Sequence, residues 1–135
     1  MRISSSDGKT WIEIRRNEGD DFPSFAFSGA VNIGHGRFTG RSTSLTFLNL
    51  SEFAEALDAF ILQRDLQPCL EGTYGSYARV WQPRSKNEVM LGFCIGDAFS
   101  GWVGTSEFKL QGEFPIEQEI LNSLVFAFRS MVRDA

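Results

Sequence analysis

The stretch FAFSGAVNI, residues 25–33, decides the expected fold because apolar and small side chains alternate along it. The apolar side chains on one side are Phe25, Phe27, Val31 and Ile33. Period two with a single apolar side is typical of a half-buried strand in an antiparallel sheet. The segment 36–48 continues the extended pattern less regularly, and Gly40 stands where a bulge is expected.

Further strands are predicted on both sides of this stretch. A short strand around Ile3 and a strand over 10–15 precede it. Three strands follow, over 73–82, 88–95 and 101–112, with turns at 85–87 and 97–101. Short neighbouring strands separated by turn residues favour antiparallel pairing over parallel crossovers.

Two amphipathic helices complete the pattern. In residues 49–65, Asn49 and Glu52 have the spacing of a capping box. In residues 115–133, Pro115 suits the first helical position. The apolar stripes are Phe53, Ala54, Leu57, Phe60 and Ile61 in the first helix, and Ile120, Leu121, Leu124, Phe128 and Val132 in the second.

The sequence therefore predicts a single α+β domain over residues 1–135. We expect a curved antiparallel sheet of six or seven strands with two amphipathic helices packed on one face. The 13 phenylalanines favour a large aromatic core, because aromatic side chains prefer strands and bury much surface.

Charge and hydropathy indicate the partners and the compartment. A net charge of −4 argues against a protein that binds the nucleic-acid backbone. No apolar run approaches the about 20 residues of a membrane span, and the first residues lack the apolar segment of a signal peptide. We therefore expect a cytoplasmic protein that binds neither nucleic acid nor membrane. That compartment favours free thiols at Cys69 and Cys94, with a bridge between them as the open alternative.

The glycine-rich stretch NIGHGRFTGR, residues 32–41, is the first candidate for chemistry. Its glycines do not follow the dinucleotide-binding pattern, and strand-like sequence follows where a phosphate site needs a helix. We expect a tight turn in which Gly34 and Gly36 take positive φ, with His35 solvated at its tip. The sequence contains no catalytic, metal-binding or cofactor motif, which favours a protein that is not an enzyme.

Two groups of side chains are candidates for binding a partner. The first is an aromatic and arginine group, Trp11, Arg79 and Trp81, on strand positions opposite to the apolar side. A second core layer that covers these rings is the alternative. The second group is the acidic helix face of Glu52, Glu55 and Asp58, for which a solvated surface is the alternative.

The segment GRFTGRSTSLTFLNLSEFAEALDAFILQ, residues 36–63, resembles a group of small bacterial α+β domains. The positions that carry the resemblance are Phe38, Gly40, Leu45, Phe47, Phe53, Leu57 and Phe60. By element order the likeness extends over about residues 25–133. The group is similar to the immunity proteins of polymorphic toxin systems and to related domains of unknown function. These positions are structural, so the resemblance assigns no binding residue.

The resemblance implies a non-enzymatic cytoplasmic binding protein that neutralises a cognate bacterial toxin by occlusion, as in toxin–antitoxin pairs. A preformed surface would cover the active site of the toxin. A small-ligand-binding domain or small enzyme with a pocket between sheet and helices is the alternative. A homodimer that pairs through an exposed aromatic face is a third hypothesis.

Overall fold

The computed structural model describes residues 1–19 and 21–134, and these residues form an α+β fold with two antiparallel four-stranded sheets. The first sheet has the order β1-β2-β3-β4, with bounds Arg2–Ser4, Trp11–Arg16, Phe25–Asn32 and Arg37–Leu45. The second has the order β5-β6-β7-β8, with bounds Cys69–Glu71, Tyr77–Trp81, Val89–Gly101 and Gly104–Ile116. The helices are α1, Leu50–Phe60, and α2, Gln118–Asp134.

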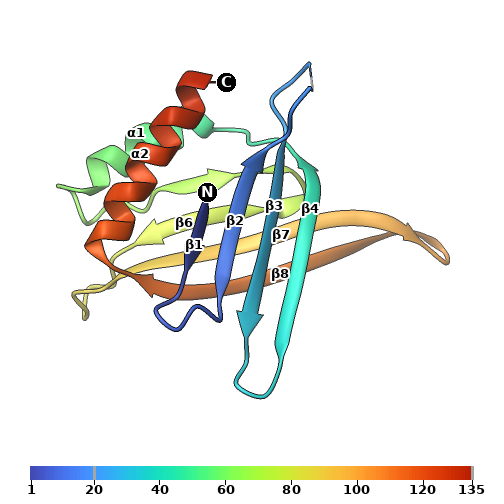
Figure 1. The fold of residues 1–135 in the computed structure, drawn as a ribbon, viewed down its shortest axis with the longest axis horizontal. Helices are drawn as coiled ribbons and strands as arrows, with labels where there is room; N and C mark the ends of the chain where they lie inside the picture. Colours follow the sequence, from blue (N-terminus) through green and yellow to red (C-terminus); the bar gives the residue numbers. More distant parts are fainter. Residues whose placement is uncertain (20, 135) are drawn as a thin grey trace.

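The expectation of one curved sheet of six or seven strands is wrong in this respect, because the strands divide into two sheets that pack face to face. Figure 1 shows the strands of the first sheet running across those of the second. Glycines permit the close approach: a Cβ atom on Gly29 would lie 2.9 Å from Ile95 Cδ1, and one on Gly112 would lie 2.7 Å from Val31 Cγ2. The apolar side of each sheet is therefore buried by the other sheet.

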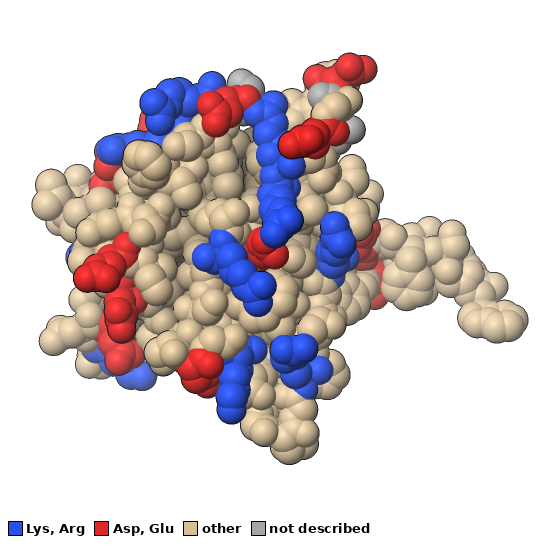
Figure 2. Space-filling model, viewed as in Figure 1, with Lys and Arg blue, Asp and Glu red and all other residues tan. Residues whose placement is uncertain are grey.

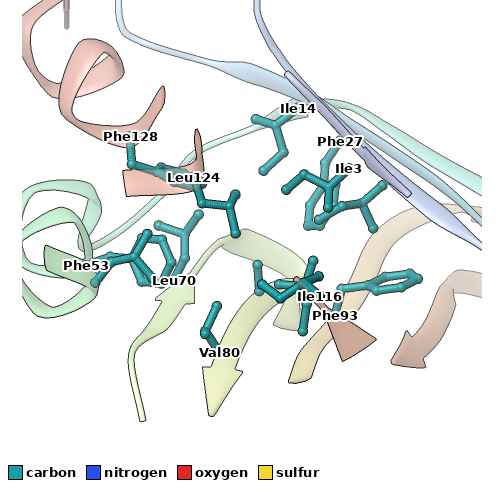
Figure 3. Packing of buried hydrophobic residues seen from close by; sticks show 14 of the residues in the cluster. Ile3, Ile14, Phe27, Phe53, Leu70, Val80, Phe93, Ile116, Leu124 and Phe128 are labelled. Carbon is teal, nitrogen blue, oxygen red and sulfur yellow. The ribbon is translucent and has the colours of Figure 1, made fainter. Parts of the chain in front are cut away.

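The two helices lie beside each other at one end of the sheets, rather than on the face of a single sheet (Figure 1). The rings of Phe53 and Phe128 meet edge to face, with 4.8 Å between their centroids. Figure 3 shows both rings near Leu70 and Leu124, in the core that also holds Phe93. The apolar stripes predicted from helical spacing are thus the surfaces that the helices bury.

The helix starts differ from the sequence-based expectation. Asn49 precedes α1, but its side chain does not cap the helix. Instead Asn49 Nδ2 donates to the Cys69 carbonyl at 2.9 Å, and Asn49 Oδ1 accepts from the Glu71 N–H at 2.8 Å. Pro115 lies in β8 opposite Met90, not in α2. A proline is tolerated there because β8 is an edge strand.

Candidate binding surface

The hairpin of β7 and β8 extends well beyond the rest of its sheet. Both strands have 13 residues. They pair along their whole length, from Val89 opposite Ile116 to Gly101 opposite Gly104. The neighbouring β6 pairs with β7 only over 90–94. The distal part of the hairpin is therefore a two-stranded extension that projects from the molecule (Figure 1).

The tip of this extension is apolar and fully exposed. Trp102 and Val103 form the two-residue turn, with relative exposures of 105% and 101%. From Ala98 to Ser106 the chain has no ionisable side chain. Figure 2 accordingly shows the far end of the extension without blue or red atoms. An exposed tryptophan without neighbouring charges is unusual on a protein surface and typical of a contact site.

Past the end of the core, the core-facing side of the hairpin carries two phenylalanines and the carboxylate of Asp97. Phe99 and Phe108 lie on the same side as Ile95 and Leu110, because alternate residues of a strand share a face. Asp97 lies on this side too, between Ile95 and Phe99 and opposite Phe108. Phe99 is 54% exposed. Phe108 packs on the backbone of β4, where a Cβ on Gly40 would lie 2.5 Å from Phe108 Cζ. Gly40 therefore serves close packing of the two sheets.

The hairpin of β3 and β4 extends its own core side in the same way. Phe38 pairs with Val31 on that side and is 61% exposed. Ile33, in the turn, is also exposed. The apolar side chains of the two hairpin ends, which extend in different directions (Figure 1), are together called the hairpin surface: Val31, Ile33, Phe38, Phe99, Trp102, Val103 and Phe108.

The glycine-rich stretch forms the turn between β3 and β4, as predicted, and continues into β4. Ile33 N–H donates to the Gly36 carbonyl at 3.0 Å, and a strand follows at once. Gly34 has a φ of 88°, whereas Gly36 does not take positive φ, contrary to expectation. His35 is exposed at the tip. The turn orients the end of the β3–β4 hairpin and does not provide the helix start of a phosphate site.

The aromatic and arginine candidates do not form one surface. Trp11 lies on the outer face of the first sheet, where the Arg2 guanidinium stacks 3.9 Å from its ring centroid. Arg79 and Trp81 lie on the outer face of the second sheet and stack on each other at 4.5 Å. The inner faces of the sheets meet, so their outer faces point apart. The three residues can therefore not contact one partner surface together.

The acidic candidates on α1 are also separated. Glu52 and Glu55 are exposed on the outer side of the helix. The Asp58 carboxylate forms an ion pair with the Arg129 guanidinium of α2. Asp58 is therefore engaged in joining the two helices, and two acidic side chains remain on this face for a partner.

The two cysteines lie on alternate strands, Cys69 on β5 and Cys94 on β7, with β6 between them. Two strand spacings separate their backbones by about 9.6 Å, which exceeds the about 7 Å that a disulfide spans. Both thiols are free. Burial raises the pKa of the Cys69 thiol, the Glu71 carboxylate adds to the rise, and the Arg79 guanidinium opposes it.

A hollow of about 490 Å³ opens between β1, the end of β8 and α2. Two of its polar side chains are engaged locally. The Ser5 hydroxyl donates to the Asp7 carboxylate at 2.6 Å, and the Ser123 hydroxyl donates to the Glu119 carbonyl at 3.0 Å. This hollow is where the pocket of the small-ligand hypothesis would lie. Within the described residues no group of three His, Cys, Asp or Glu side chains is placed to hold a metal ion.

Sequence reasoning placed a turn at 97–101, but these residues belong to β7 and the hairpin turn is formed by Trp102 and Val103. The available signal was Gly101-Trp102-Val103-Gly104, in which glycines flank an apolar pair, inside a long uncharged segment. Over residues 1–19 and 21–134, neither helix has the length and apolar character to span a membrane. Comparisons with known protein families, curated proteins and solved structures found no match to this chain.

Proposed function

We propose that this protein is a non-enzymatic binding protein that acts in the cytoplasm and neutralises a cognate bacterial toxin by occlusion. The observation that carries the proposal is the hairpin surface. Large apolar side chains are exposed where a protein meets another protein, and tryptophan is prominent among the residues that dominate such contacts.

The shape of the hairpin surface supports occlusion. A narrow two-stranded extension with Trp102 and Val103 at its end fits a concave site and not a flat one (Figure 1). The continuous pairing of β7 and β8 holds the tip in place before binding. Such preorganisation reduces the entropy lost on association. The tip would enter the active-site cleft of the toxin, while Phe99 on the same hairpin would cover its rim.

The test is co-expression with the product of the neighbouring gene. If that product arrests growth, the wild-type protein should restore it, and Trp102→Ser combined with Val103→Ser should not. Leu62→Ser is a matched control, because Leu62 is 90% exposed but lies just after α1, away from the hairpin surface. A harmless neighbouring product, or equal protection by the hairpin variant, would count against the proposal.

Light scattering distinguishes the homodimer hypothesis from the toxin proposal. We expect a monomer over the concentrations used for binding. A dimer that the Trp102→Ser, Val103→Ser variant dissociates would show that the hairpin surface pairs with a second copy, and the toxin proposal would then lose its supporting observation.

The hollow between β1 and α2 favours small-ligand binding as the second candidate function. An apolar dye such as anilinonaphthalene sulfonate can bind either this hollow or the hairpin surface. Ser123→Trp should fill the hollow. If that change abolishes dye fluorescence and the hairpin variant does not, small-ligand binding is the better-supported function. If the hairpin variant abolishes dye fluorescence and Ser123→Trp does not, the dye binds the hairpin surface and the first proposal is supported.

A further inference from the structure

The outer face of the first sheet is basic in a protein whose net charge is −4. Its outward positions carry four arginines, Arg2, Arg15, Arg37 and Arg41, and Glu13 is the one carboxylate among the outward side chains of these described strands. The face therefore has a net charge of +3. Figure 2 shows Lys and Arg side chains distributed over this side of the molecule.

Two of these arginines flank a hollow of about 300 Å³ whose floor consists of small side chains. Glu13 and Arg15 on β2 form one wall and Arg41 on β4 the other, with Ala26 and Ser28 of β3 between them. The walls are two strand spacings apart, about 9.6 Å. This width fits a single extended polypeptide and is too small for a nucleic-acid duplex.

Two of the four cations on this face, Arg15 and Arg2, are held in position before a ligand arrives. The Arg15 guanidinium bonds the Glu13 carboxylate at 2.6 Å, yet the Arg15 side chain remains 74% exposed. The Arg2 guanidinium is fixed by stacking on Trp11. All four cations are arginines, whose planar guanidinium groups bind carboxylates through two parallel hydrogen bonds.

We propose that this outer face binds a short acidic polypeptide segment, with Arg15 and Arg41 as the residues that bind its carboxylates. The site is separate from the hairpin surface, because it uses the opposite side of the first sheet, and it does not depend on the toxin proposal. A long polyanion is disfavoured, since the rest of the chain is acidic and would repel it. Single-stranded nucleic acid would need an open aromatic ring for stacking, and Arg2 already covers Trp11.

The experiment uses a fluorescein-labelled peptide in which glutamate alternates with threonine, so that an extended chain directs its carboxylates to one side. Fluorescence anisotropy at low salt should show binding to the wild-type protein. Arg15→Gln combined with Arg41→Gln should weaken binding by at least about tenfold, because each charge-assisted pair contributes that much. Arg84→Gln combined with Arg133→Gln removes the same charge from exposed positions elsewhere and should leave binding within about twofold.

Two controls are needed to interpret the result. A peptide with glutamine in place of glutamate should not bind. Circular dichroism should show that both double variants are folded, which is expected because all four arginines are exposed. The proposal is overturned by absence of peptide binding at low salt, by equal loss in the two double variants, or by tighter binding of a labelled oligonucleotide or anionic vesicles of equal charge.

Discussion

The Ser76 side chain forms with the Gly96 backbone the hydrogen bonds that a neighbouring strand would otherwise form. Ser76 Oγ accepts from the Gly96 N–H at 2.9 Å and donates to the Gly96 carbonyl at 3.3 Å. Both groups are buried, and Gly96 lies just past the end of the β6–β7 pairing. One hydroxyl thus satisfies two backbone groups at the residue where the projecting hairpin leaves its sheet, and so fixes the base of the hairpin surface.

The first prediction concerns Gly96→Ala. A Cβ at this position would lie 2.1 Å from the Tyr74 carbonyl oxygen, in the 3₁₀ turn Thr73–Gly75. This backbone cannot yield without displacing the turn, so we expect a loss of about 2–4 kcal/mol in the free energy of unfolding. Urea denaturation measures it. Gly36→Ala is the control, because its Cβ would meet only the Ile33 side chain at 3.7 Å, and a change below about 0.5 kcal/mol is expected.

The second prediction compares two buried serines. Ser42 Oγ is buried and makes no hydrogen bond, whereas Ser76 Oγ makes two. Ser76→Ala should cost about 1–3 kcal/mol because it leaves the Gly96 groups unpaired. Ser42→Ala should leave stability unchanged or raise it, because it removes an unsatisfied hydroxyl. Equal losses in the two variants, measured by thermal unfolding, would contradict the assignment.

The third prediction tests the role of Asn49. Its side chain both donates to Cys69 and accepts from Glu71, joining the start of α1 to β5. Asn49→Asp keeps the acceptor but loses the donor and adds a charge facing the Cys69 carbonyl, so it should lower the free energy of unfolding by about 1 kcal/mol or more, as Asn49→Ala does. An ordinary helix cap would give a different result, because aspartate caps as well as asparagine.

The fourth prediction concerns the thiol of Cys69, studied with Cys94→Ser as background. Its raised pKa favours the neutral thiol in the folded state. The associated stabilisation is present below the ordinary thiol pKa of 9.0 and is lost as the pH rises through the folded-state pKa. Iodoacetamide should therefore alkylate the folded protein more slowly than the unfolded chain near pH 8. Glu71→Gln should accelerate the reaction and Arg79→Gln should slow it; opposite signs would contradict the stated causes.

The fifth prediction uses the three tryptophans as probes. Trp102 is fully exposed, whereas Trp11 and Trp81 are half-buried beneath arginines. Trp102→Phe should reduce quenching of the remaining fluorescence by acrylamide, and Trp81→Phe should increase it. Stability of the Trp102 variant should stay within about 0.5 kcal/mol of the wild type, because the ring has no intramolecular packing to lose. Unchanged quenching in this variant would mean that the tip is covered in solution.

The sequence by itself determined the local elements, since side-chain periodicity depends only on which side of each element is buried. The strand at 25–32 followed from alternation and both apolar helix stripes from three- and four-residue steps, and the turn at Gly34 followed from glycine spacing. These features confirm the coarse α+β prediction. An element that buries one side repeats apolar residues with the period of a strand or a helix, whichever element covers that side.

Only the tertiary structure decided which buried sides meet. The alternation of residues 25–33 does not show that Gly29 packs against Ile95 of the other sheet. The same local pattern is compatible with one continuous sheet or with two packed sheets. Trp11 and Trp81 lie in different sheets, and the Asn49 side chain bonds β5 in place of capping the helix. Both facts follow from contacts between distant parts of the chain. The hairpin surface is likewise a long-range result: Phe38 and Phe99 occupy ordinary core positions of their strands, and they are exposed because no opposing layer covers the ends of the two hairpins.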